Sequence, residues 1–389
     1  MNYDFNEPIN RENTNSLKYD LRKEKFGKQD VIPMWVADMD FRTPDFIVDA
    51  LKRYTENKIF GYFLFSDSYY QSIINWNNRH HQWIIEKNWI TFSPGVVPSL
   101  SLSVLSYTEP GDKIIIQPPV YPPFFFVIRD NQRQIVENPL ILREDRYFMD
   151  FDDLEKKLKD AKMILLSNPH NPGGTVWERS ELKRFGELCV KYNVLVVSDE
   201  IHSDLVFKPN KFIPLASISE EIAENTITLM APSKTFNMAG LSSSYVVLSN
   251  TKLKKRFDAV MHTIHVGLGN MFGIAATEAA YCNGDEWLKQ LLDYLKSNID
   301  FVEKYLKEKI PQIQMMRPEG TYLIWLDCRK LNLQNKELNI FFIEKATIGM
   351  NNGETFGTGG EGFMRLNVAC PKHIVEKAMK NIEIAVNNL

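Results

Sequence analysis

One lysine of this chain lies where a lysine can do covalent chemistry. Residues 226–230, Thr-Ile-Thr-Leu-Met, form an apolar run typical of a short buried strand, and Ser233 and Lys234 follow on a turn. A lysine there can reach into a cleft and form a Schiff base with a carbonyl cofactor. Most lysines are exposed to solvent, so Lys234 considered alone is better explained as a solvated loop residue.

Polar side chains also follow two other predicted strands. Asn171 comes shortly after a strand predicted over residues 163–167, and Asp199 and His202 come after the next one. Because ligands of parallel sheets bind beyond the carboxyl ends of the strands, we expect these side chains and Lys234 at one rim. Each has an ordinary alternative: a turn for the Asn-Pro motif, a helix cap for the carboxylate, and a buried or surface position for the histidine. Their conjunction indicates a site.

The elements that must position these residues alternate along the chain. Apolar strand patterns occur at residues 114–117, 163–167, 194–198, 226–230 and 245–248. Helical patterns, such as residues 180–192, lie between strands, which predicts an α/β fold with a mostly parallel sheet covered on both faces. The composition changes near Gly284. A long helix over residues 285–309 and strands at 321–326 and 363–368 predict a second, smaller α+β region.

Length and composition exclude several classes of protein. The chain has 389 residues, which favours two domains, and 44% hydrophobic with 24% charged residues is typical of a soluble globular protein. A net charge of −3 predicts no nucleic-acid partner, and no apolar run approaches the ~20 residues of a membrane helix. Four widely spaced cysteines predict neither a metal site nor disulfides. With no signal-peptide pattern at the N-terminus, we expect a cytoplasmic protein.

The three motifs together resemble a known family. Their order is Asn-Pro-x-Asn-Pro-x-Gly, Asp-Glu-x-His and Ser-Lys-x-x-Asn, with 28 residues from Asn171 to Asp199 and 35 from Asp199 to Lys234. This is similar to the fold-type I pyridoxal-phosphate (PLP) enzymes of the class I/II aminotransferase group, over nearly the whole chain. Within that group the chain looks closest to the C–S lyase (cystathionine β-lyase) branch, by its residues 33–41, 199–205 and 363–367.

The resemblance implies an architecture. A large PLP-binding domain over residues 45–284 would hold a mostly parallel, seven-stranded sheet between helices. A smaller α+β domain would combine the N-terminal arm, residues 1–44, with the C-terminal segment, residues 285–389. The resemblance also implies a homodimer with shared active sites.

The resemblance assigns most of the catalytic and ring-binding roles. Lys234 would carry the Schiff base to PLP and move the proton at the substrate Cα. Asp199 would pair with the pyridine nitrogen and keep it protonated, which makes the ring a better electron sink. Asn171 and His202 would face the ring 3′-oxygen, and Tyr121 would stack on the ring. An ordinary apolar packing role for Tyr121 remains an alternative.

The remaining expected contacts hold the cofactor phosphate and the substrate. The phosphate would lie against backbone N–H groups at a helix N-terminus, with help from a hydroxyl and from a partner-subunit tyrosine: Gly95, Val96, Val97, Ser233 and Tyr62. The sequence departs from the broader pattern at Ser242, where an arginine is frequent, and at Ala231, where a serine is frequent. Arg365 would grip the substrate carboxylate as a bidentate fork, with Ala37 nearby.

We therefore predict a PLP-dependent carbon–sulfur β-lyase. Its reaction would be the α,β-elimination of L-cystathionine or a related sulfur amino acid to pyruvate, ammonia and a thiol. An aminotransferase acting on an L-amino acid and a 2-oxo acid is the alternative within the same group. A non-catalytic regulatory protein with this fold is a third hypothesis, which the complete set of Asn171, Asp199, Lys234 and Arg365 disfavours because binding alone needs no electron sink.

Overall fold

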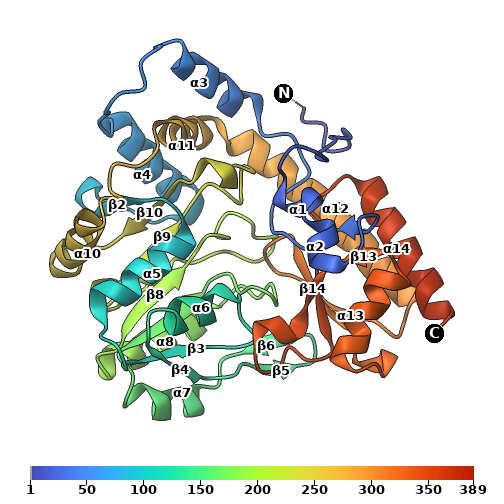
Figure 1. Cartoon of the computed structure of the whole chain (residues 1–389). Coiled ribbons are helices and arrows are strands. Elements are labelled where there is room, and N and C mark those ends of the chain that lie inside the picture. The colour runs from blue at the N-terminus through green and yellow to red at the C-terminus, as the bar shows by residue number, and fades with distance from the viewer. Residues whose placement is uncertain (1) are drawn as a thin grey trace.

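The five strands predicted in the middle of the chain join β2 and β4, which were not predicted, in one seven-stranded sheet of the computed structural model, which describes residues 2–389 (Figure 1). The strand order is β2-β10-β9-β8-β7-β3-β4. The strands are β2 (Ile90–Ser93), β3 (Lys113–Ile116), β4 (Gln134–Glu137), β7 (Met163–Ser167), β8 (Leu195–Asp199), β9 (Thr226–Met230) and β10 (Ser244–Val247). The predicted α/β class is confirmed.

One strand of this sheet runs against the others. β10 pairs antiparallel with both β9 and β2, whereas the remaining neighbours pair in parallel. The link from β9 to β10 contains only a short 3-10 turn, Ala239–Leu241, and no crossover helix, so the chain returns in the opposite direction. The sequence prediction of a mostly parallel sheet is therefore correct. The reversal also orients β2 like β9, so both end at the same edge.

Helices cover both faces of the sheet, as alternating strand residues require. Ile114 and Ile116 pack with one layer and Ile115 with the other. The first layer contains α5 (Val96–Tyr107), α6 (Pro123–Arg129) and α10 (Thr251–Thr263). The second contains α7 (Phe151–Leu158), α8 (Arg179–Lys191) and α9 (Glu220–Glu224).

The C-terminal part of the chain forms a second, antiparallel sheet of order β11-β12-β15-β14. Its strands and helices are β11 (Gln314–Met316), β12 (Leu323–Asp327), β14 (Asn351–Asn352), β15 (Phe363–Asn367), α13 (Asn335–Glu344) and α14 (Lys372–Asn387). The N-terminal arm lies beside this part (Figure 1), because β1 (Ile32–Pro33) pairs in parallel with β13 (Ile348–Gly349). The predicted domain boundaries, at residues 44 and 284, stay a prediction.

The remaining elements connect these two sheets. The long helix predicted over residues 285–309 is present as α12 (Asp285–Lys309), and one continuous apolar cluster joins it to the helices near the large sheet. These are α3 (Asp45–Thr55), α4 (Asp67–His81) and α11 (Met271–Asn283); the chain also contains α1 (Leu17–Asp20), α2 (Arg22–Phe26) and the hairpin of β5 (Ile141–Arg143) and β6 (Arg146–Phe148). Among residues 2–389, no helix is both long and apolar enough to cross a membrane.

A fully buried carboxyl group ties the ends of β7 and β8 to the following loop. Glu200 Oε1 accepts hydrogen bonds from Ser198 Oγ (2.8 Å), Leu215 N (3.1 Å) and Asn168 Nδ2 (3.4 Å). No ion pair with Glu200 occurs in the part of the chain that the structure describes. Burial raises the pKa of Glu200 to about 8, although these hydrogen bonds oppose the rise. The carboxyl group is therefore held largely neutral at neutral pH.

Glu200→Gln should make stability less sensitive to rising pH. The folded-state pKa of Glu200 lies above its unfolded value, so its contribution is fully present below about pH 4 and is lost as the pH rises toward about 8. The wild-type free energy of unfolding should fall, relative to the variant, by up to about 1.4 kcal/mol per pH unit in that window. Urea unfolding across the pH range measures this. Parallel curves for the two proteins would contradict it; Glu187→Gln, at an exposed position of α8, is the control.

Candidate active site

A cavity of about 200 Å³ opens at the edge where β7, β8 and β9 end. The register places Ser167 opposite Asp199, and Asp199 opposite Leu229, so the three strand ends are level. Ten of the twelve residues predicted for the site line this cavity: Ala37, Gly95, Val96, Val97, Tyr121, Asn171, Asp199, His202, Ser233 and Lys234. The structure thus brings together side chains that are separated by nearly 200 residues of sequence.

Lys234 lies on the turn after β9 and points to the N-terminal arm. Its Nζ donates a hydrogen bond to the carbonyl oxygen of Ala37 at 2.6 Å. Burial and the neighbouring Arg365 cation lower the pKa of Lys234 to about 8, while the Asp38 and Asp199 carboxylates oppose this fall. About one tenth of Lys234 is therefore unprotonated at pH 7, far more than for an ordinary lysine, and a nucleophilic or basic lysine requires this form.

Asp199 is the last residue of β8, and its carboxylate faces the cavity. Its side chain is almost wholly buried and accepts a hydrogen bond from Ile201 N at 3.2 Å. Burial raises the pKa of Asp199 to about 7, although this hydrogen bond and the Lys234 charge oppose the rise. A cation placed against this carboxylate would favour its ionised form, because the burial cost would then be offset by pairing.

Arg365 lies in β15 and enters the site from the second sheet. It does not line the cavity itself, but its Nη1 donates to Asn171 Oδ1, which does, at 3.0 Å. Its Nη2 donates to Trp35 O (3.0 Å) and Asn351 Oδ1 (2.8 Å). These acceptors are neutral, and among the described residues no carboxylate forms an ion pair with Arg365. Burial lowers the pKa of Arg365 to about 10.

The buried guanidinium is therefore incompletely satisfied. Arg365 is 4% exposed, and its Nε has no hydrogen-bond partner among the residues described. A buried cation without a paired anion is costly, and a carboxylate ligand is the group that fits a guanidinium fork. The geometry thus favours an anionic ligand group beside Asn171.

His202 and Tyr121 provide neutral rings on the cavity wall. Burial lowers the pKa of His202 well below its ordinary value, and the Lys234 and Arg365 charges act in the same direction, so the ring is neutral. Its Nδ1 has no partner among the described residues. Burial raises the pKa of Tyr121, so its phenol is also neutral at physiological pH.

The far end of the cavity is an uncapped helix N-terminus. Gly95 precedes α5, and no side chain caps the first turn of this helix, which leaves the N–H groups of Val96 and Val97 as donors. Ser233 lines the same cavity, as do the two departures from the broader pattern, Ala231 and Ser242. Lys234 is the one cation among the lining residues.

Tyr62 does not join this cluster within one chain. It lies in the segment between α3 and α4, and 96% of its surface is exposed. Its predicted contact is with the partner subunit's cofactor, so its place in a single chain neither supports nor contradicts that role.

Sequence reasoning missed three residues that hold the site together. Tyr322 OH donates to Ala37 O at 2.9 Å, and Asn367 Nδ2 donates to the carbonyls of residues 36 and 38. Asn237 Oδ1 accepts from Met39 N at 3.0 Å. Asn237 belongs to the Ser-Lys-x-x-Asn motif, which is a usable signal. Asn367 ends the segment 363–367 that carries the resemblance, whereas Tyr322 has no comparable signal; the contacts of both depend on the folding of residues 35–41 against them.

The residues of the cavity fit PLP. The cofactor's phosphate matches the free N–H donors of α5, and its ring nitrogen matches the buried carboxylate of Asp199. The partnerless Nδ1 of His202 can take up a further polar contact, and Lys234 supplies the amine for covalent attachment. The donor set is therefore complementary to PLP without an arginine at the phosphate end.

Comparison with known proteins gives the same relationship. Residues 29–382 match the family described as "Aminotransferase class I and II". The chain is 42% identical to cystathionine beta-lyase PatB of Bacillus subtilis over 389 residues, which cover 100% of both chains.

Solved structures agree along the whole chain. A PLP-bound putative aminotransferase from Clostridium difficile has a TM-score of 0.98 and 48% identity, covering 99% of this chain and 100% of that one. Cystalysin from Treponema denticola, which contains pyridoxal 5′-phosphate, has a TM-score of 0.97 and 35% identity, with 100% of each chain covered. The predicted family is confirmed, and the chain belongs to the aminotransferase class I and II family.

Proposed function

We propose that this chain is a PLP-dependent carbon–sulfur β-lyase that acts on L-cystathionine or a related sulfur amino acid. The observation that carries the proposal is the convergence of Lys234, Asp199 and Asn171 on one cavity, beside the buried, anion-free guanidinium of Arg365. The 42% identity to a full-length relative named as a cystathionine β-lyase supports the choice of reaction.

Lys234 performs the proton transfers in this proposal. The chemistry that PLP supplies when bound is an electron-withdrawing ring that stabilises negative charge at the substrate Cα. With its pKa lowered to about 8, Lys234 can take the Cα proton at neutral pH and afterwards return a proton to a departing group. The Ala37 carbonyl, 2.6 Å from Nζ, holds the free amino group in the cavity.

Four residues of the cavity hold the cofactor ring and adjust its charge: Asp199, Asn171, His202 and Tyr121. Asp199 keeps a positive charge on the ring nitrogen by pairing with it, because the carboxylate is buried where few other partners can reach it. Asn171 presents its side chain between Arg365 and the cavity and so links cofactor and substrate positions. His202 is a neutral ring neighbour, and Tyr121 provides the aromatic face.

Arg365 orients the substrate through its carboxylate. Its Nε–H and one Nη1–H have no partner among the described residues, which also offer it no carboxylate. A substrate carboxylate would pair with this guanidinium and so fix the Cα–H bond relative to Lys234.

Elimination and transamination share these first steps and differ in the fate of the charge at Cα. A thiolate at Cβ is a good leaving group, so elimination needs only a site that admits the sulfur arm. An aminotransferase remains the second candidate, since the 48%-identical structure from Clostridium difficile is described as a putative aminotransferase. No side chain of the cavity forces one outcome, so a reaction assay must decide.

The active form in this proposal is a cytoplasmic homodimer. The segment between α3 and α4 exposes four large apolar side chains, Ile59, Phe60, Tyr62 and Leu64, at 58–96% of their surface. Exposed apolar side chains gathered on one segment are typical of a surface that another chain covers. Covering it with a second copy would bring Tyr62 to the partner's cofactor phosphate.

L-cystathionine supplied without any 2-oxo acid tests the reaction. We expect sustained, stoichiometric release of pyruvate and homocysteine over many turnovers, because elimination regenerates the enzyme. Lys234→Ala should lose nearly all turnover, since both the attachment and the proton transfers depend on its amine. A single burst that restarts only after addition of 2-oxoglutarate or pyruvate would instead make the protein an aminotransferase.

Arg365→Ala and Asp199→Ala should affect different kinetic constants. Loss of the charge-assisted fork should raise KM about 10- to 100-fold with PLP still bound, because the ring contacts remain. Loss of the buried carboxylate should lower kcat by about 100-fold or more, because charge stabilisation at the ring is lost. Steady-state kinetics with absorbance of bound PLP measures both; Arg329→Ala, at an exposed arginine, is the control. Equal loss of PLP from both variants would show that Arg365 does not serve the substrate.

Two inactive variants should complement each other if the active sites are shared. Tyr62→Ala and Lys234→Ala subunits, mixed and reassembled, form a mixed dimer in which one site regains both residues. We expect up to one quarter of the wild-type activity at equal mixing, because about half of the dimers are mixed and each has one intact site. Absence of recovery after verified subunit exchange would place Tyr62 outside the partner's site.

A further inference from the structure

The carbonyl oxygen that receives Lys234 is occupied from two sides. Ala37 O accepts Lys234 Nζ at 2.6 Å and Tyr322 OH at 2.9 Å, which uses both of its lone pairs. A backbone oxygen of the N-terminal arm therefore positions the free amino group of Lys234, and no residue of the large sheet donates to or accepts from it among the described residues.

The peptide units around this carbonyl are fixed by a buried asparagine. Asn367 Nδ2 donates to Val36 O at 2.6 Å and to Asp38 O at 2.7 Å, so the carbonyls before and after Ala37 are both held. The backbone on either side of Ala37 has little freedom to turn the Ala37 carbonyl away from Lys234. What remains to be held is the Asp38 side chain, which follows directly.

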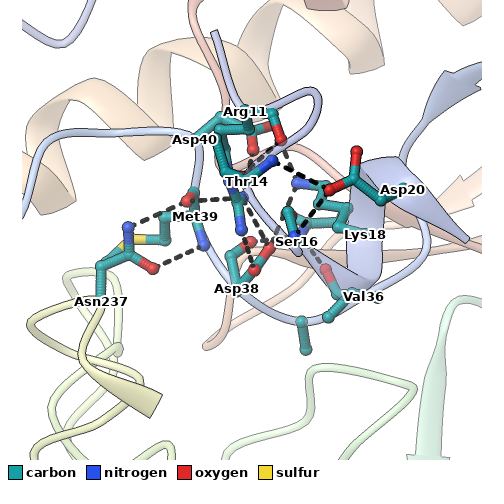
Figure 2. A network of polar contacts seen from close by, with 12 residues as sticks. Arg11, Thr14, Ser16, Lys18, Asp20, Val36, Asp38, Met39, Asp40 and Asn237 are labelled. Carbon is teal, nitrogen blue, oxygen red and sulfur yellow. Dashed lines mark hydrogen bonds and ion pairs between the residues drawn. The ribbon is translucent and has the colours of Figure 1, made fainter. Parts of the chain in front are cut away.

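An ion-pair network in the N-terminal arm holds that side chain (Figure 2). Arg11 binds Asp38 with two hydrogen bonds, Nη2 to Oδ2 at 2.6 Å and Nη1 to Oδ1 at 3.2 Å, and its Nη1 also reaches Asp40 Oδ1 at 2.6 Å. Lys18 Nζ donates to Asp40 Oδ2 at 2.8 Å. Lys18 is 1% and Asp40 6% exposed, so the pair is largely shielded from solvent.

The network contains equal numbers of positive and negative side chains. Of these, only Asp38 has a charge that affects the pKa of Lys234 directly. Two cations, Arg11 and Lys18, face two carboxylates, Asp38 and Asp40. The Asp38 charge raises the pKa of Lys234, and Arg11 lies on the same carboxylate and offsets that charge. The bidentate fork thus sets both the position of Asp38 and the net charge that it presents.

The other charged groups around Lys234 come from β8 and β15. Asp199 of β8 acts in the same direction as Asp38, while Arg365 of β15 opposes both. His202, which follows β8, is buried and neutral, so it adds no charge. Asp38 differs from these groups in that the N-terminal arm supplies it with a charged partner, Arg11.

We propose that the Arg11–Asp38 ion pair is a positioning device for Lys234, because it holds the residue next to the Ala37 carbonyl and sets the charge that this residue presents to the lysine, and that the N-terminal arm is therefore a working part of the active site. The inference rests on the proposed role of Lys234 in proton transfer. Neither Arg11 nor Asp38 lines the cavity; in this proposal they set the place and the electrostatic surroundings of the lysine.

Three variants and a control separate this role from a general loss of stability. Arg11→Ala leaves the Asp38 charge without its partner, Asp38→Asn removes that charge and keeps an acceptor for Arg11, and the double variant removes both charges. Arg42→Ala is the control, because Arg42 also belongs to the N-terminal arm but pairs with the exposed side of Glu7. Thermal melting verifies that each protein is folded.

The primary measurement is the pH dependence of Lys234 acylation by acetic anhydride, followed by peptide mapping, in the full-length chain without PLP. The midpoint for Lys234 should rise by about 0.5–1 pH unit in Arg11→Ala, fall by about 0.5–1 unit in Asp38→Asn, and return near wild type in the double variant. A structural defect alone does not produce shifts of opposite sign that cancel. Unchanged midpoints, shifts of the same sign, or the same shift in Arg42→Ala would overturn the proposal.

The holoenzyme supplies a second measurement. The acid limb of kcat against pH should move in the same directions as the acylation midpoint, with KM changed less than twofold, because Arg365 and its contacts are intact. If the protein does not turn over L-cystathionine, the acylation shifts still test the ion pair, so the two proposals fail separately. If Arg11→Ala does not fold, Asp38→Asn decides alone: no downward shift of the Lys234 midpoint would overturn the inference.

Discussion

The site depends on the register between neighbouring parallel strands. Because Ser167, Asp199 and Leu229 are level across β7, β8 and β9, each strand releases its polar residues at the same edge. A slip of one residue would turn the side chains of a strand to the opposite face. The reversal at β10 then orients β2 so that it too ends at this edge, where α5 begins. The amine of Lys234, the carboxylate of Asp199 and the first N–H groups of α5 meet there for topological reasons.

Burial is the common cause of the unusual protonation in this region. It lowers the pKa of Lys234, Arg365 and His202 and raises that of Asp199, in each case against the charged form. Attraction between Lys234 and Asp199 opposes the shifts of these two groups without removing them. The cavity is therefore an environment in which an amine is readily deprotonated and an anionic ligand is favoured.

The second sheet and the N-terminal arm supply residues of the site that the large sheet does not contain. Arg365 arrives on β15, and residues 35–41 are fastened between Asn367 on that strand and Asn237 after β9. Because β1 pairs with β13, the backbone just before residues 35–41 is held in place by hydrogen bonds to the C-terminal part of the chain. Residues 35–41 therefore link the two sheets beside Lys234.

The sequence by itself determined the fold class, the family and most of the polar residues of the site. Apolar runs reveal buried strands, and the spacing from Asn171 to Lys234 is specific enough to identify the relationship. Ten of the twelve residues named for the site meet at the cavity, and those after β7, β8 and β9 do so because motifs that follow parallel strands reach one edge.

Only the tertiary structure decided the antiparallel direction of β10, the neutrality of Glu200, and the contacts of Tyr322, Asn367 and Arg11 with residues 35–41. These features depend on burial and on partners distant in sequence. The residues next to a side chain in the sequence do not indicate which distant carbonyl or carboxylate it will contact. These contacts can therefore be identified only in the folded chain.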